Sequence, residues 1–256
     1  MKKRILSILT AALLLLALLP LSAAGADGGT YWDDATNAYL YSEWHYGIVT
    51  CRQMHVRDRA STNGSSYGQI KNGQTVKVLG ITQDNNFYVL DLDSCGFTGT
   101  APGAYGYAKS SLIKIDPEFI ATTRTTNLYA TPWTTELKNG EWNNRFFLVL
   151  AEHNDWYAVQ LMETAPGTGF IRAREMGDYS SSTGYNFIVS WDTNVYAEGD
   201  WKDLGTVKRF TPCRLLSSYS GADSISSEYS LVLFNAGEKK EYSAWILNQN
   251  IAPILN

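Results

Sequence analysis

One phrase occurs twice in this chain. TNLYATP begins at Thr126, and TNVYAEG begins 67 positions later at Thr193. Self-similarity at a regular spacing marks a repeated structural unit, so it constrains the fold more strongly than local propensity does. Aligning the sequence with itself brings Val56, Leu128 and Val195 to the same place, at spacings of 72 and 67 residues. The 256 residues therefore contain three related units.

The three units share a pattern of short strands. Each has a short strand, a loop rich in small polar residues, an alternating strand (TVKVLG, RFFLVLA) and a strand that opens on an aromatic residue. Alternation with period two predicts strands with one buried face, and several such strands predict a small barrel. A short segment such as KSSL, after the last aromatic residue of a unit, fits a single helical turn. We interpret the equivalent aromatic residues as core residues, namely Phe87, Trp156 and Tyr229 at strand starts and Tyr107, Phe170 and Trp245 at the closing position.

The first unit resembles the bacterial SH3-like (SH3b) domain of exported and wall-associated proteins. The residues that carry the resemblance are GIVTCRQMHVRDRAST, YGQIKNGQTVKVLG, FYVL and GYAKSSLI, which together cover residues 47–115. In the third unit, LGTVKRFTPCRLLS is similar to YGQIKNGQTVKVLG without a gap, whereas the second unit fits through its strands and its FIRAREM ending. The resemblance implies an all-β chain of three tandem small SH3-like barrels.

The N-terminal segment MKKRILSILTAALLLLALLPLSAAGA predicts a cleaved secretory signal, because a cationic start and an apolar run are followed by small residues. A transmembrane anchor is the alternative, but Ser7, Thr10 and Pro20 interrupt the apolar run. We therefore expect a secreted monomer, free or associated with the cell wall, with no membrane anchor after cleavage. The expected organisation is a signal peptide at 1–26, an N-terminal extension at 27–46, and SH3-like domains at 47–116, 117–178 and, in divergent form, 179–256.

The net charge of the exported chain limits the classes of ligand that it can bind. The formal net charge is −4, and the predicted signal contributes three cations and no acid, so the remaining chain is near −7. An acidic chain without a Lys/Arg cluster lacks the electrostatic footprint needed for nucleic acid or anionic lipid. The expected ligand is therefore neutral, zwitterionic or cationic.

The repeat alignment assigns one of the three cysteines to a core position and leaves the other two as a candidate pair. Cys213 takes the place of Val76 on an alternating strand, so we interpret it as a buried residue that behaves as a small hydrophobe. Cys51 and Cys95 remain, both in the first unit, and we predict a disulfide between them. Closing a loop of that size would stabilise the fold by about 4 kcal/mol. The alternative is two separate thiols.

The sequence predicts no catalytic chemistry. His45, His55 and His153 have no metal-ligand spacing among them, so we expect no metal site. A Cys–His nucleophile pair would need Cys213 to be exposed. No glycine-rich phosphate loop is present, and the segment left outside the signal and the repeats is too short for a catalytic domain. We therefore expect a non-enzymatic protein without a cofactor.

Aromatic residues are the strongest sign of a binding surface. Eight Trp and sixteen Tyr exceed what three small cores can use. Trp133 and Trp201 lie in the long loop after a first strand, which in SH3-like barrels flanks the peptide groove, and Trp142 is the third candidate. Packing of these tryptophans between adjacent repeats is the alternative.

The resemblance implies that the barrels recognise cell-wall peptidoglycan peptide or a related extracellular ligand. The rival interpretation is a structural or protein-interaction module that docks on another exported protein.

Overall fold

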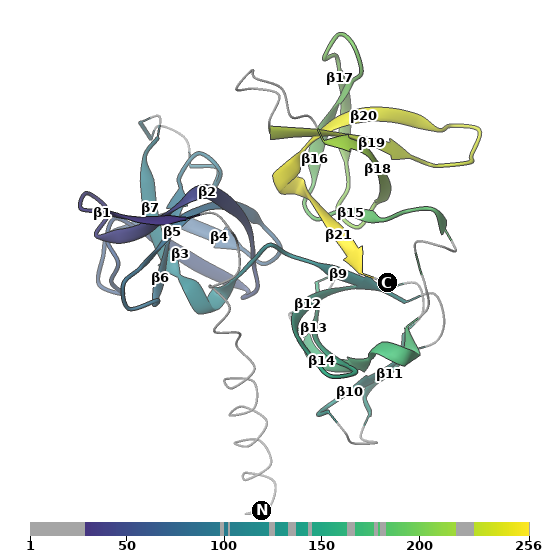
Figure 1. Ribbon diagram of the computed structural model, residues 1–256, viewed down its shortest axis with the longest axis horizontal. Helices are drawn as coiled ribbons and strands as arrows, with labels where there is room; N and C mark the ends of the chain where they lie inside the picture. Colours follow the sequence, from purple (N-terminus) through teal and green to yellow (C-terminus); the bar gives the residue numbers. More distant parts are fainter. Residues whose placement is uncertain are drawn as a thin grey trace, which may run out of the picture. The chain divides into compact units, whose positions relative to one another are not determined.

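The computed structural model describes residues 29–255, except 98–99, 102, 123–125, 133–136, 143–144, 163–166, 177–178, 180–182 and 219–227 (Figure 1). The predicted signal peptide lies outside these residues. Within the described ranges, no helix is long and apolar enough to cross a membrane.

The first repeat is a sheet of eight strands. Its hydrogen-bonded order is β1-β2-β5-β6-β7-β3-β4, and β8 pairs with β2. A single turn of 3-10 helix, η1 (Ser110–Leu112), leads into β8. The strands are β1 (Thr30–Asp33), β2 (Ala38–Val49), β3 (Gln53–Arg57), β4 (Ser66–Lys71), β5 (Thr75–Thr82), β6 (Phe87–Asp91), β7 (Tyr105–Lys109) and β8 (Ile113–Ile115).

The second repeat has the order β11-β10-β14-β13-β12-β9, and the third has β21-β15-β18-β19-β20-β16-β17. The second comprises β9 (Phe119–Ala121), β10 (Thr126–Tyr129), β11 (Leu137–Trp142), β12 (Phe146–His153), β13 (Trp156–Leu161), β14 (Gly167–Arg172) and the turn η2 (Ala173–Glu175). The third comprises β15 (Phe187–Val189), β16 (Thr193–Ala197), β17 (Asp203–Val207), β18 (Pro212–Ser218), β19 (Tyr229–Phe234), β20 (Tyr242–Leu247), the turn η4 (Asn248–Asn250) and β21 (Ile251–Leu255).

The three repeats have one strand order. When strands are counted from β2, β9 and β15, each repeat pairs its strands in the order first, fourth, fifth, sixth, second, third. In the first and third repeats a 3-10 turn then delivers a seventh strand onto the first. Val56, Leu128 and Val195, aligned from the sequence, lie on the second strand of their repeats and are all buried.

The predicted all-β class is confirmed by this arrangement, but closed barrels are not observed. In the described residues the strand order is an open path rather than a ring. The chain divides into two compact units, one formed by Ile120–Gly177 and the other by Gly28–Phe119 with Asp178–Asn256. The domain boundaries given by the sequence stay predictions.

The residues expected to precede the first domain take part in its sheet. β1 and β2 form an antiparallel hairpin, and β2 also pairs with β5 from Ala38 to Ile48. Thr36 caps the tight turn between β1 and β2 because its backbone N–H and its hydroxyl both donate to Asp33 Oδ2, at 2.8 and 2.7 Å. The extension is thereby held on the first repeat.

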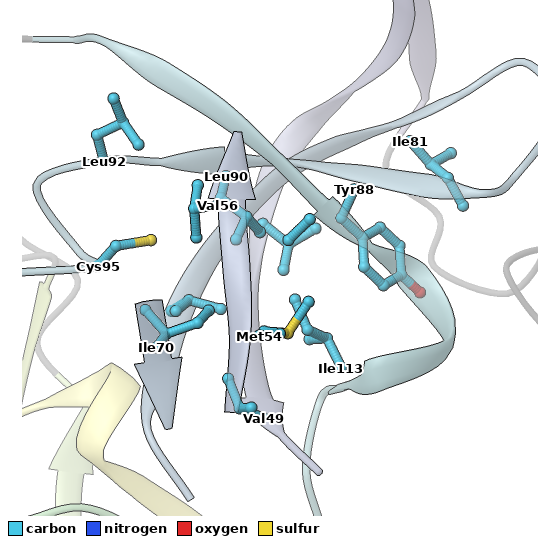
Figure 2. Close-up of a cluster of buried hydrophobic side chains, with 13 residues drawn as sticks. Val49, Met54, Val56, Ile70, Ile81, Tyr88, Leu90, Leu92, Cys95 and Ile113 are labelled. Atoms are coloured by element: carbon cyan, nitrogen blue, oxygen red, sulfur yellow. The ribbon is translucent and has the colours of Figure 1, made fainter. Parts of the chain in front are cut away.

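Both cysteines of the first repeat contact its hydrophobic core. Val49, Met54, Val56, Ile70, Leu90, Leu92 and Cys95 belong to one buried cluster, and Figure 2 shows the Cys95 sulfur directed into it. Cys51 is half-buried and packs against the same cluster. The predicted Cys51–Cys95 disulfide is not supported, because both residues are free thiols in the structure. Cys95 instead acts as a small apolar core residue.

Candidate functional site

The three tryptophans selected from the sequence have different surroundings. Trp133 lies outside the described residues. Trp142, at the end of β11, is half-buried and meets Phe147 edge to face, with ring centroids 6.0 Å apart. Trp201 lies between β16 and β17 and is 42% exposed, which is high for so large an apolar side chain.

Trp201 belongs to a cluster of four rings, called here the third-repeat aromatic cluster: Tyr196, Trp201, Tyr229 and Trp245. Its indole stacks on that of Trp245 at 5.6 Å with 15° between the planes. It meets Tyr229 edge to face at 5.1 Å and Tyr196 at 6.3 Å. Tyr196 and Tyr229 are 5.9 Å apart. Offset or edge-to-face pairs at such separations are favourable beyond the area that they bury.

Strand register brings three of these rings to one face of the sheet. Tyr196 on β16 lies opposite Trp245 on β20. Trp245 also lies opposite Leu231 on β19, and Tyr229 at the start of β19 lies opposite Leu247. Because residues directly opposite in a ladder point to the same side, Tyr196, Trp245 and Tyr229 share a face.

Trp201 is held in place by the turn that joins β16 to β17. Gly199 has a φ of 103° and Trp201 itself has a φ of 55°, in the left-handed region. A left-handed conformation at a bulky residue costs on the order of 1 kcal/mol or more, so it persists only where contacts compensate. Stacking on Trp245 supplies that compensation.

Carboxylates surround the Trp201 turn. Glu198 accepts a hydrogen bond from Ser243 Oγ at 3.0 Å, and Asp200 accepts one from the Lys202 backbone N–H at 3.1 Å. Asp203 lies opposite Tyr196 and accepts from the Gly205 N–H at 2.7 Å. None of these three acids enters an ion pair with a described residue.

The equivalent face of the second repeat is closed by a cation. Tyr129, Trp156 and Phe170 are all buried, and the Arg172 guanidinium carbon lies 5.1 Å from the centre of the Tyr129 ring and 4.8 Å from that of Trp156. Glu175 Oε1 accepts a hydrogen bond from the Tyr129 hydroxyl at 2.9 Å. Arg172 lies opposite Trp156, as Leu247 lies opposite Tyr229 in the third repeat.

The equivalent face of the first repeat is covered by the chain itself. The Tyr107 hydroxyl donates to the Thr36 carbonyl at 2.6 Å, and the Tyr105 hydroxyl donates to the Ala35 carbonyl at 3.0 Å. Both acceptors belong to the turn between β1 and β2. Tyr107 is thereby buried together with Ala38.

The third-repeat aromatic cluster is thus the exposed member of three equivalent faces in the described chain. The sequence singled out Trp201 but placed Tyr229 and Trp245 in the core, where their counterparts Trp156 and Tyr107 lie. Both are only half-buried and form the floor on which Trp201 rests. The sequence feature that distinguishes the exposed face is Leu247. It occupies the position at which the second repeat has Arg172, the cation that covers the rings.

Two of the histidines are hydrogen-bonded, and the Cys213 thiol is buried. His45 Nδ1 is 2.8 Å from Asp116 Oδ2, and His55 Nδ1 is 2.8 Å from Ser66 Oγ. Cys213 is fully buried, and burial raises its pKa to about 12, so the thiol is neutral. Among described residues, no group of His, Cys, Asp and Glu has metal-ligand geometry.

Comparison with known proteins gives limited matches. No family model and no curated protein matches the chain. Among solved structures, the chain is similar to NlpC2 from Trichomonas vaginalis, with 13% identity and a TM-score of 0.23 over 54% of this chain and 49% of that one. It is also similar to NlpC1 from the same organism, with 14% identity and a TM-score of 0.22 over 63% of this chain and 51% of that one. The chain spans about half the length of each of these proteins.

Proposed function

We propose that this chain is a secreted, non-catalytic binding protein of three SH3-like units that recognises cell-wall peptidoglycan peptide or a related extracellular ligand. The SH3-like assignment is supported by the strand order common to all three repeats and by the single 3-10 turn after the sixth strand. It is also supported by the SH3b-like sequence of the first repeat.

The observation that carries the proposal is the third-repeat aromatic cluster. Exposed, mutually supported rings with polar neighbours form a surface on which extended peptides or sugar faces pack. The cluster lies at the hairpin between β16 and β17, the third-repeat counterpart of the loop that flanks the peptide groove in SH3-like barrels. Its rings are preorganised by stacking, so binding would cost little ordering entropy.

Co-sedimentation with purified peptidoglycan sacculi tests this proposal. The chain without its predicted signal peptide, Asp27–Asn256, should sediment with sacculi at both low and moderate salt. Trp201→Ala should reduce the bound fraction several-fold, because it removes the exposed indole and leaves the strands intact.

A matched control separates this effect from non-specific adsorption of exposed aromatic side chains to sacculi. Tyr67 is 47% exposed on β4 of the first repeat and is not part of the third-repeat aromatic cluster, so Tyr67→Ala should sediment like the unmodified chain. Absence of sedimentation with sacculi of several cross-bridge types would contradict wall recognition and direct the search to exported protein partners.

A further inference from the structure

The second repeat shows what this face of the fold can hold. There the Arg172 guanidinium lies over Tyr129 and Trp156, with the Glu175 carboxylate 3.7 Å from its Nη1. Aromatic faces attract cations through the ring quadrupole, and a nearby carboxylate adds to that attraction. The second repeat is therefore an internal example of a cation held by these rings.

The third repeat keeps the rings and lacks the cation. Tyr196 and Tyr229 stand where Tyr129 and Trp156 stand, but Leu247 replaces Arg172. The Trp201 indole lies against these rings instead and remains 42% exposed. The aromatic surface is thereby extended outward rather than closed.

The turn that carries Trp201 has a net negative charge, because Glu198, Asp200 and Asp203 outnumber the one cation there, Lys202. Glu198, Asp200 and Asp203 flank Trp201 in the turn, and no described residue pairs with them as a cation. Glu228, next to Tyr229, differs because it forms an ion pair with Lys77. Carboxylates around an exposed indole favour a positively charged ligand over an anionic one.

We infer that the third-repeat aromatic cluster binds a cationic side chain, a lysine-type ammonium or a guanidinium, carried by an extended peptide. This inference rests on the binding role proposed above and adds the chemical class of the ligand. The incoming cation packs on the outer face of Trp201, with Glu198, Asp200 and Asp203 as counter-charges.

The test uses three probes with the chain that lacks its predicted signal peptide, Asp27–Asn256: acetyl-Gly-Gly-Lys-Gly-Gly-amide, the same peptide with Nε-acetyllysine, and the same peptide with glutamate. Binding is followed by isothermal calorimetry and by the indole N–H resonances of Trp201 and Trp245. Acetylation removes the charge and keeps the length of the side chain. The acetylated probe should bind about two- to thirtyfold more weakly than the lysine probe, and the glutamate probe should bind more weakly still.

Two variants make the test specific. Leu247→Arg places a guanidinium beside Tyr229, as Arg172 lies beside Trp156, so like-charge repulsion should abolish the preference for lysine. Leu247→Gln is the matched neutral control and should keep that preference. Circular dichroism and thermal unfolding establish that both variants are folded.

The outcomes separate this inference from the proposed function. Equal affinity for the lysine and acetyllysine probes, or no binding of either by a chain that still sediments with sacculi, overturns cation recognition and leaves wall binding in place. A lysine preference that depends on Leu247, in a chain that fails to sediment, supports cation recognition and overturns the wall as its target.

Discussion

At the scale of single residues, burial decides what each thiol does. Cys95 and Cys213 take core positions, and burial raises the pKa of each to about 12. Cys51 is half-buried, and burial raises its pKa too. The role of Cys213 as a core residue followed from its alignment with Val76. The pairing of Cys51 with Cys95 could not be tested by alignment, because the direction of a side chain in a turn is set by tertiary packing.

Thiol counting checks the cysteine assignments. The unfolded chain, treated with a thiol reagent in denaturant without reductant, should react at three cysteines. In the folded chain Cys51 should react fastest, because Cys95 and Cys213 are 3% and 0% exposed. A count of one would show that Cys51 and Cys95 are bridged and would contradict the structure.

The neutral thiol of Cys213 predicts a loss of stability at alkaline pH. In the unfolded chain this thiol ionises near its ordinary value of 9.0, whereas in the folded chain it ionises near 12. Its contribution is therefore complete below pH 9 and is lost as the pH rises toward 12, at no more than about 1.4 kcal/mol per pH unit.

Cys213→Val isolates this contribution, because valine occupies the equivalent place at residue 76. Urea unfolding at pH 8.0 and 10.5 should show a smaller fall in the free energy of unfolding for the variant than for the unmodified chain. Identical falls would mean that Cys213 is not the titrating group.

At the scale of elements, equivalent strands carry different surfaces. The alignment correctly found the strand starts at Phe87, Trp156 and Tyr229, because aromatic residues and period-two alternation repeat there. It could not tell which aromatic faces are exposed. That depends on what covers each face, namely the turn around Thr36 in the first repeat and Arg172 in the second. The turn lies outside the repeated pattern, and the position of Arg172 carries Lys109 in the first repeat but Leu247 in the third.

The β2–β5 pairing depends on a glycine. Gly80 lies opposite Leu40, next to a register shift, and a Cβ there would come within 2.3 Å of the Tyr39 carbonyl oxygen and 2.8 Å of Leu40 Cα. Because backbone atoms make this contact, Gly80→Ala should lower the free energy of unfolding by about 1–3 kcal/mol in urea titrations. Gly29→Ala, with no atom within 4 Å of the added Cβ, is the control and should be nearly neutral. Equal effects would contradict the predicted close approach.

At the scale of the whole molecule, the compact unit formed by Gly28–Phe119 with Asp178–Asn256 is joined by buried polar contacts. Asn250 accepts a hydrogen bond from Thr75 Oγ1 at 2.8 Å and donates one to Thr193 Oγ1 at 2.9 Å. All three side chains are buried. The sequence could not reveal this link, because Thr75 and Asn250 are 175 residues apart.

Removing Asn250 tests that link. Asn250→Ala leaves two buried hydroxyls without this partner and should cost about 1–3 kcal/mol. Hydrogen exchange should accelerate in both Gly28–Phe119 and Asp178–Asn256. Thr206→Ala removes an exposed hydrogen bond to Asn194 and should change stability by less than about 0.5 kcal/mol. Acceleration confined to Asp178–Asn256 would show that Asn250 does not couple the two segments.

Ligand binding at the third-repeat aromatic cluster can be observed directly in the tryptophan indole N–H resonances as solubilised peptidoglycan peptides are added. We predict saturable shifts of Trp201 and Trp245, with Trp156, which is buried against Arg172, unchanged. Shifts at Trp156 or Trp142 with none at Trp201, or no shift at any indole, would contradict binding at this cluster.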